Sequence, residues 1–436
     1  MPWILRRREG RPRGGLDSGT FDAQPAPPAE GAAACTPEPW SPTLNWRAFV
    51  TFLSIVLLIM GSVHWYLFER LVAATAIPPP LSTALGLVLA GFVLSIPLSF
   101  VASRRLDRNV ARYFVVPVYV WLGFAFQAFF LVLAIDIVRW VAKALMQLAG
   151  AAPLWNDPAQ ALLAWQVTAG AAVATVLTAT LFAIWWGLTR LVVRRVEVPL
   201  SRLPAAMDGF TILHLTDIHL DLVHGRKWLE GVVARANALG ADLVAITGDL
   251  AEGSVAQFGD DAAPIKELAA PHGVYFVTGN HEYFHDLKGW LGYLQDAGVR
   301  VLRNERVAIG EGEAGFDLAG VDDHNGARLA PGHGPDLARA LEGRDPRREL
   351  VLLAHQPRII REAAQQGVGL VLSGHTHGGQ IWPFSYLVYL QQPYVKGLIK
   401  EGGTRLYLSS GTGFWGPPMR MGTTAEMALI TLRTQG

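Results

Sequence analysis

Four long apolar segments occupy the first half of the chain and limit its fold more than any other feature. They cover residues 48–68, 81–102, 113–138 and 161–188 and contain few charged side chains. A helix needs about 20 apolar residues to cross the hydrocarbon core of a bilayer. The alternative is that the segments are four core helices of a soluble domain. It is disfavoured because four apolar segments of this length occur together and contain so few charged residues. Residues 46–190 are therefore predicted to form a four-helix transmembrane region.

The distribution of arginine predicts how these segments cross the membrane. Arginines are frequent before the first segment, between the second and third, and after the fourth, whereas the first connection has only Arg70 and the third has Arg139 and Lys143. Positive charge favours the cytoplasmic side. The C-terminal half is thus predicted to be cytoplasmic, in a multi-pass protein of the inner or plasma membrane. Asp136 is interpreted as an interfacial group beside Arg139, with a functional buried acid as the alternative.

The first 45 residues differ in composition from both halves that follow. They are rich in Arg, Pro, Gly and Ala, which predicts a disordered basic tail. A twin-arginine export signal is disfavoured because Arg7 and Arg8 lie far from the first apolar segment. Cys35 is the single cysteine of the chain, which excludes an intrachain disulfide framework and thiolate metal ligation. It is interpreted as an inert tail thiol.

After a short linker at 191–209, the region 210–436 alternates short apolar runs with amphipathic stretches. The runs predict buried strands at 211–215, 243–246, 274–277, 350–353 and 369–372. Helices are predicted at 228–239, 286–297 and 335–341. This alternation indicates α/β layering. Because ligands of α/β sheets collect outside the carboxyl ends of the strands, the residues that follow the runs are predicted to share one pocket.

Each apolar run is followed by side chains that bind metals. They are Asp217 and His219, Asp249, Asn280, His355, and His375 with His377. Residues two apart face the same side of an extended backbone, so the two closely spaced pairs are each predicted to converge. The two oxygens of Asp249 suit it to bridge two cations. The mixture of carboxylate, amide and imidazole donors favours Mn²⁺, Fe or Zn²⁺ over Mg²⁺ or Ca²⁺.

The order and type of these motifs resemble the calcineurin-like metallophosphoesterase superfamily. The matching motifs are Asp217-x-His219, Gly248-Asp249, Gly279-Asn280-His281-Glu282, His355 and Gly374-His375-x-His377. The resemblance covers about residues 208–432, and 374–380 and 215–220 look most like its YkuE-type and transmembrane branch. It implies an α/β domain of two packed mixed β-sheets flanked by helices in four layers, preceded by the α-helical four-span transmembrane bundle.

The resemblance also implies a role for each residue. Two divalent metal ions would share Asp249, one held by Asp217, His219 and His377 and the other by Asn280, His355 and His375. His281 would donate a proton to the leaving oxygen or stabilise the phosphoryl charge, and Glu282 would orient His281. The two cations would lower the pKa of a bridging water, and the resulting hydroxide would attack phosphorus in line. A metal-free relative is disfavoured because every ligand type is present.

The apolar run at 381–390 follows the last metal motif and leaves two interpretations open. It packs in the core, or it forms an exposed lip that touches the bilayer or an acyl chain. The lip favours hydrolysis of a phosphodiester or pyrophosphate bond in a lipid-linked substrate. The alternatives are a tethered phosphatase or cyclic-nucleotide phosphodiesterase on soluble substrates, and a membrane sensor or transporter with a regulatory metal domain. No nucleic acid partner is expected, because no basic stripe interleaves with aromatics.

Other polar residues near the motifs receive simpler interpretations. His214 alternates with apolar neighbours and is predicted to be a core histidine, and His224 a plain loop residue. His285 is undecided between the cleft and the loop. Residues 322–325 are predicted to make turn and capping contacts.

Overall fold

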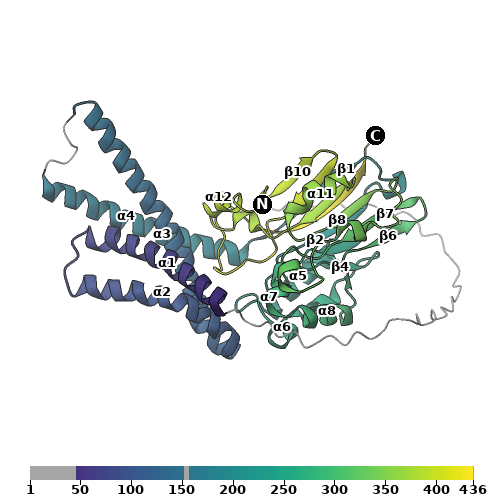
Figure 1. Cartoon of the computed structure of the whole chain (residues 1–436), viewed down its shortest axis with the longest axis horizontal. Coiled ribbons are helices and arrows are strands. Elements are labelled where there is room, and N and C mark those ends of the chain that lie inside the picture. The colour runs from purple at the N-terminus through teal and green to yellow at the C-terminus, as the bar shows by residue number, and fades with distance from the viewer. Residues whose placement is uncertain (1–45, 152–156, 436) are drawn as a thin grey trace, which may run out of the picture. The chain divides into compact units, whose positions relative to one another are not determined.

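The computed structural model describes residues 46–151 and 157–435 (Figure 1). The predicted basic tail and Cys35 lie outside the described residues. The chain from Thr51 to Gly436 forms one compact unit. This unit contains the first predicted span from Thr51 onward, the other three predicted spans and the predicted α/β region.

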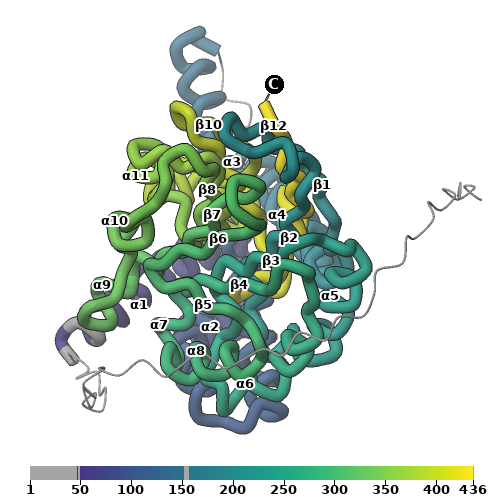
Figure 2. The backbone as a smooth tube through the Cα atoms, turned by 90° about the vertical axis from the view of Figure 1, so that its right-hand side faces the viewer, coloured from purple at the N-terminus to yellow at the C-terminus, as the bar shows by residue number. Residues whose placement is uncertain are grey.

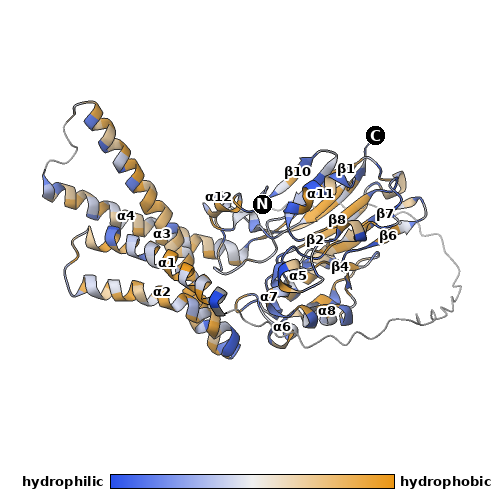
Figure 3. Ribbon diagram, in the orientation of Figure 1, coloured by the Kyte–Doolittle hydropathy of each residue, from blue (hydrophilic) through white to orange (hydrophobic). Residues whose placement is uncertain are grey.

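Four long helices occupy the predicted transmembrane region. They are α1 (Trp46–Phe68), which continues into the π-helical turn η1 (Glu69–Ala73), α2 (Leu81–Arg105), α3 (Arg108–Leu148) and α4 (Pro158–Thr189). Each contains a stretch long and apolar enough to cross a membrane, and Figure 3 shows them mostly in orange and white. The side chains of Asp107 and Asp157 cap α3 and α4 by accepting the N–H groups of Asn109 and Ala159. The four predicted helices are confirmed.

Asp136 joins two of these helices. Its carboxylate accepts a hydrogen bond of 2.7 Å from the Tyr66 hydroxyl and forms an ion pair with Arg70. Arg139, the partner expected from the sequence, instead stacks over the ring of Trp165 at 4.1 Å. Asp136 therefore links α3 to the end of α1 and to η1, because a charge among apolar helices is stable only when it is paired.

The predicted linker at 191–209 begins with a strand of the α/β region. Only Arg190 separates α4 from β1 (Leu191–Leu200). This strand pairs in parallel with β12 (Ala425–Thr434) along its whole length, from Leu191 opposite Ala425 to Leu200 opposite Thr434. The linker prediction is therefore wrong for these residues, whose partner strand lies at the far end of the sequence. The last membrane helix runs almost directly into the sheet.

The α/β region contains two six-stranded mixed sheets. In the first, β12 lies between β1 and β2 (Figure 2), and the order continues through β2 (Thr211–Leu215), β3 (Leu243–Ile246), β4 (Val274–Phe276) and β5 (Arg300–Val301). The second has the order β10 (Gly397–Glu401), β11 (Thr404–Leu408), β9 (Leu370–Ser373), β8 (Leu350–Leu353), β7 (Ala314–Gly320) and β6 (Glu305–Glu311). Strands β2 to β5 are parallel, as are β7, β8, β9 and β11. Their carboxyl ends therefore meet on one side of each sheet.

Three apolar clusters hold the sheets and helices together. The middle cluster lies between the sheets and includes Ile212 of β2 and Phe316 of β7. On the outer face of the first sheet, Leu229 and Trp290 come from the helices α5 (Arg226–Ala238) and α8 (Leu287–Asp296). On the outer face of the second sheet lie residues of α10 (Leu337–Ala340) and α11 (Ile360–Gln365). The layers are helix, sheet, sheet and helix, which confirms the predicted fold.

Candidate metal centre

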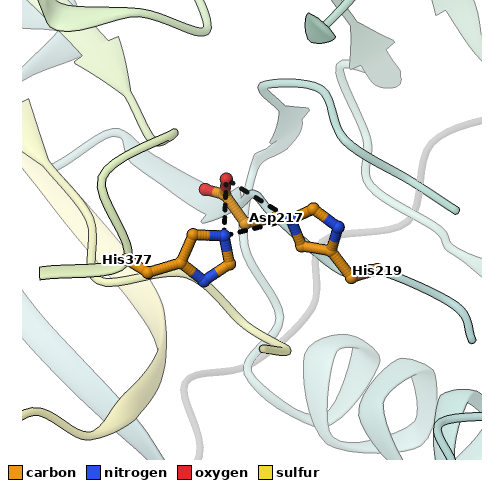
Figure 4. A group of neighbouring side chains, drawn as sticks. All are labelled: Asp217, His219 and His377. Atoms are coloured by element: carbon orange, nitrogen blue, oxygen red, sulfur yellow. Dashed lines mark hydrogen bonds and ion pairs between the residues drawn. The ribbon is translucent and has the colours of Figure 1, made fainter. Parts of the chain in front are cut away.

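The loops that follow β2 and β9 bring three of the predicted ligands together (Figure 4). Asp217, His219 and His377 each offer a ligand atom within 4.8 Å of the others. Nε2 of His377 lies 3.0 Å from Nε2 of His219 and 3.3 Å from Oδ1 of Asp217. All three side chains are buried. This set is the first of the two groups that the family resemblance implies.

A second group lies at the ends of β3, β4, β8 and β9. It consists of Asp249, His355 and His375, again with ligand atoms within 4.8 Å of one another. Nε2 of His355 lies 3.1 Å from Oδ2 of Asp249 and 3.1 Å from Oδ1 of Asn280. Nδ1 of His375 lies 3.2 Å from the same His355 nitrogen. All seven predicted ligands therefore fall into two adjoining groups.

The backbone at these residues is strained. Left-handed φ angles occur at five of the seven, namely Asp217 (51°), His219 (46°), Asp249 (56°), His375 (72°) and His377 (50°). Such conformations cost about 1–3 kcal/mol per residue and concentrate at functional sites. Asp217 and His219 converge as predicted, but through left-handed turns rather than through extended backbone. The predicted convergence of His375 with His377 is wrong, because the two belong to different groups.

Two glycines allow the loops after β3 and β4 to touch. Gly248 has φ of +85°, and a Cβ atom there would collide with the backbone nitrogen of Gly279. A Cβ atom on Gly279 would in turn overlap the carboxylate of Asp249 and lie 2.6 Å from its backbone nitrogen. Larger residues would push apart the loops that carry Asp249 and Asn280.

The donor set fits divalent cations. Asp217 and Asp249 are buried, and among the described residues no Lys or Arg side chain pairs with either carboxylate. Asp217 accepts hydrogen bonds from the Thr216 hydroxyl and the His375 N–H, and Asp249 accepts the N–H of His281. The other close neighbours are histidines whose ring nitrogens point at one another. Buried carboxylates are most stable when a positive charge accompanies such hydrogen bonds, and cations between these oxygens and imidazole nitrogens would supply it.

His281 lies beside the two groups and pairs with a carboxylate that the sequence analysis missed. It belongs to α7 (Asn280–His285), and its Nε2 atom lies 3.9 Å from Oδ2 of Asp249. Its Nδ1 atom lies 2.9 Å from Oε1 of Glu252, which also bonds Nδ1 of His219. Burial lowers the pKa of His281, but Glu252 and Asp249 raise it more, so the pKa lies above its ordinary value of 6.5. Glu252 follows Asp249 by three residues in the same loop, and this spacing could have identified it as a residue of the centre.

Glu282, which was expected to orient His281, has a different set of contacts. Its carboxylate accepts backbone N–H groups from Gly279 at 2.6 Å, Leu250 at 2.8 Å and Asp249 at 3.1 Å. The side chain is buried and ties the loop after β3 to the loop after β4. Glu252 therefore lies beside His281, whereas Glu282 is bonded to the backbone of the two loops that carry Asp249 and Asn280.

The remaining polar residues are divided between the core and the edge of the centre. His214 is buried, with Nε2 2.8 Å from Oγ1 of Thr247, as expected of a core histidine. His224 is also buried, because its ring stacks on Trp228 at 3.9 Å. His285 borders the centre, with Nε2 3.7 Å from Glu252. Asp322 accepts two hydrogen bonds from Arg303.

Comparison with known proteins agrees with this geometry. The sequence pattern of the calcineurin-like phosphoesterase family matches residues 210–379, which include all seven predicted ligands. A protein named uncharacterized metallophosphoesterase from Aquifex aeolicus is 34% identical over 248 residues, which make up 56% of this chain and 92% of that protein. The chain belongs to the calcineurin-like phosphoesterase family.

Two further relatives confirm the predicted branch. The transmembrane protein with metallophosphoesterase domain of Bos taurus is 40% identical over 252 residues, or 55% of this chain and 57% of that protein. The uncharacterized metallophosphoesterase YkuE of Bacillus subtilis is 29% identical over 243 residues, or 54% of this chain and 82% of YkuE. The chain thus matches little more than half the length of its transmembrane relative.

Proposed function

We propose that the chain is a membrane-anchored phosphoesterase that uses two divalent metal ions to hydrolyse a phosphodiester or pyrophosphate bond in a lipid-linked substrate. The position of Asp249 carries the proposal. Its Oδ2 atom lies 3.7 Å from Nε2 of His219 in one group and 3.1 Å from Nε2 of His355 in the other. A carboxylate that faces both groups is suited to bridging two cations.

The two groups would each hold one cation. Asp217, His219 and His377 fit one, Asn280, His355 and His375 fit the other, and Asp249 would be shared. A pair of bound cations supplies Lewis acidity to the phosphoryl oxygens and to an attacking water. The mixed oxygen and nitrogen donors favour Mn²⁺, Fe or Zn²⁺.

His281, oriented by Glu252, would donate a proton to the leaving oxygen. Oε1 of Glu252 lies 2.9 Å from Nδ1 of His281 and pairs with the ring, and Nε2 faces the centre near Asp249. From there Nε2 can donate a proton to the leaving oxygen as the phosphorus–oxygen bond breaks. The reaction requires no serine or cysteine nucleophile.

Contacts of the membrane helices with α6 (Val255–Ala262) and with the loop between β11 and β12 support a lipid-linked substrate. Arg108 of α3 donates to the carbonyl of Gln257 at 3.0 Å and pairs with Asp261. The carbonyl of Ala183 in α4 accepts the backbone N–H of Arg420 at 2.9 Å, and the Arg420 side chain donates to the carbonyl of His377. A phosphoester carried by a lipid would meet these segments of the α/β region as it leaves the bilayer. The arginine distribution further supports a cytoplasmic position for the centre.

The test uses the full chain purified in detergent, with Mn²⁺, Fe²⁺ or Zn²⁺ added separately. It is incubated with a membrane lipid extract and with a panel of nucleotides, and released products are identified by mass spectrometry. Metal-dependent release of phosphorylated head groups is expected, and Asp249→Asn should abolish it while the protein still folds. Release from nucleotides alone would overturn the lipid-linked substrate. Equal hydrolysis by the Asp249→Asn variant would overturn the metal mechanism itself.

A further inference from the structure

A group of exposed apolar side chains follows the last metal-binding loop. We call residues 382–390 the aromatic ledge. The ledge contains α12 (Phe384–Val388), which has no buried residue. Of the nine large apolar side chains exposed after residue 190 in the described chain, six lie in the ledge: Trp382, Phe384, Tyr386, Leu387, Tyr389 and Leu390. The other three are Phe284, Leu398 and Trp415. Core packing, one of the two interpretations of this run, therefore does not describe it.

The composition of the ledge matches the interface of a bilayer better than water or a protein core. From residue 378 to residue 395 the chain contains no Asp, Glu, Lys or Arg. The exposed side chains combine Trp and Tyr with Leu, and Leu390 is 81% exposed. Trp and Tyr are enriched at the level of lipid head groups, where the ring is apolar and its polar atom remains hydrated. An uncharged patch of this kind is costly in water and stable at the membrane surface.

The ledge is continuous with the membrane helices. Ile381, the residue before it, packs in a buried cluster with Ala183 of α4 and with Met419. The ring of Phe384 lies 6.0 Å from the ring of Phe126 of α3, centroid to centroid. The backbone N–H of Trp382 bonds the carbonyl of Met421 at 2.9 Å. These contacts fix the base of the ledge on the helices and leave its outer side chains exposed among the described residues.

The base of the ledge also touches the metal loop. Gly379, two residues after His377, has φ of +82°, and a Cβ atom there would collide with the Cα and Cβ atoms of Ser385. The side chain of Gln380 donates to the carbonyl of Trp415 at 2.8 Å. The ledge is therefore in direct contact, through Ser385 and Gly379, with the loop that carries His375 and His377.

We infer that the aromatic ledge inserts into the lipid interface as a membrane anchor additional to the four helices. Its partner is the head-group and upper acyl region of a bilayer, into which apolar faces sink by about 5–10 Å. The inference does not depend on the substrate, because the ledge would insert equally if the metal centre hydrolysed a soluble phosphoester.

The test measures the surroundings of single labelled cysteines in the full chain. Cys35→Ser removes the native thiol, and Tyr386→Cys or Leu390→Cys then carries an environment-sensitive fluorophore. The proteins are placed in nanodiscs of phosphatidylcholine with or without lipid bearing a spin label near its head group. Leu58→Cys in α1, 71% exposed, is the control for lipid contact, and Glu313→Cys in the exposed turn between β6 and β7 is the control for water.

The expected result is a blue-shifted emission at positions 386 and 390, as at position 58, and a loss of signal to the spin-labelled lipid that position 313 does not show. Emission like that of position 313 at both sites would overturn the inference. A blue shift without quenching by the lipid would also overturn it, since it would assign the ledge to a protein partner or to a second copy of the chain.

Discussion

Oε1 of Glu252 lies 2.9 Å from Nδ1 of His281. The pair joins the loop after β3 to α7 and directs the other ring nitrogen of His281 toward the two groups of metal-binding side chains. Because Glu252 also bonds His219, one carboxylate fixes a proposed proton donor and a proposed metal ligand. Such outer partners often affect activity nearly as much as the ligands themselves.

Glu252→Gln is expected to lower kcat by about 10- to 100-fold, because His281 loses the anion that orients and charges it. The loss should grow as the leaving group becomes more basic, since only such groups need a proton. The measurement is kcat for a series of aryl and alkyl phosphodiesters, with metal content checked in each preparation. An equal loss for all leaving groups at full metal content would contradict the positioning role.

Glu282→Ala is expected to destabilise the fold rather than to alter one catalytic step. It leaves three buried backbone N–H groups without their acceptor, at a cost of about 1–3 kcal/mol for each group. The thermal unfolding midpoint should fall and metal content should fall with it. Glu313→Ala, in the exposed turn between β6 and β7, is the matched control and should keep a midpoint close to that of the parent. A Glu282→Ala protein that is stable and metal-loaded would reverse these assignments.

Gly187→Val is expected to reduce both metal content and activity. A Cβ atom at Gly187 in α4 would lie 3.0 Å from the backbone of Met419 and Arg420, which has no flexible end to move aside. The displaced Arg420 would loosen the loop that it bonds at His377 and Ser410. Gly170→Val, in the same helix with nothing within 4 Å of its Cβ position, is the control. Equal activities of the two variants would exclude coupling between α4 and the centre.

Metal removal is expected to lower the stability of the protein. Without cations, five strained ligand residues lose their metal bonds, and the two buried carboxylates keep only their hydrogen bonds. A ligand at 100 times its Kd stabilises a fold by about 2.7 kcal/mol, and a chelator should remove a contribution of this order per site. Scanning calorimetry with and without EDTA measures it, and His377→Ala should show a smaller difference. An unfolding midpoint that EDTA does not change in a metal-loaded sample would contradict metal binding by these residues.

His214 predicts a pH dependence of stability that does not involve the metals. Burial lowers its pKa from 6.5 to about 4 in the folded protein. The folded state therefore binds this proton less readily than the unfolded state, and stability falls as the pH drops from about 6.5 to about 4, by up to about 3 kcal/mol. In the presence of EDTA, His214→Gln should flatten this part of the stability profile. Parallel profiles for parent and variant would show that His214 does not titrate.

The sequence by itself determined the elements whose signals are local. Apolar length identified the four helices, and short runs bounded by turn residues located β2, β3, β4, β8 and β9 to within about a residue. The chemistry of the residues that follow these strands identified the seven candidate ligands, because parallel strands bring their carboxyl ends to one edge. These conclusions required no knowledge of distant contacts.

Tertiary structure decided what depends on residues far apart in the chain. The sequence predicts a linker where β1 lies, because the partner strand β12 is at the opposite end of the α/β region in the sequence. The family resemblance implies the division of His375 and His377 between two groups, but the left-handed backbone angles that produce this division are visible only in the structure. Glu252 lies beside His281. Glu282 does not, because its carboxylate is already bonded to backbone N–H groups of two loops. Sequence patterns name the groups that can react, whereas long-range pairing and loop geometry decide which of them meet.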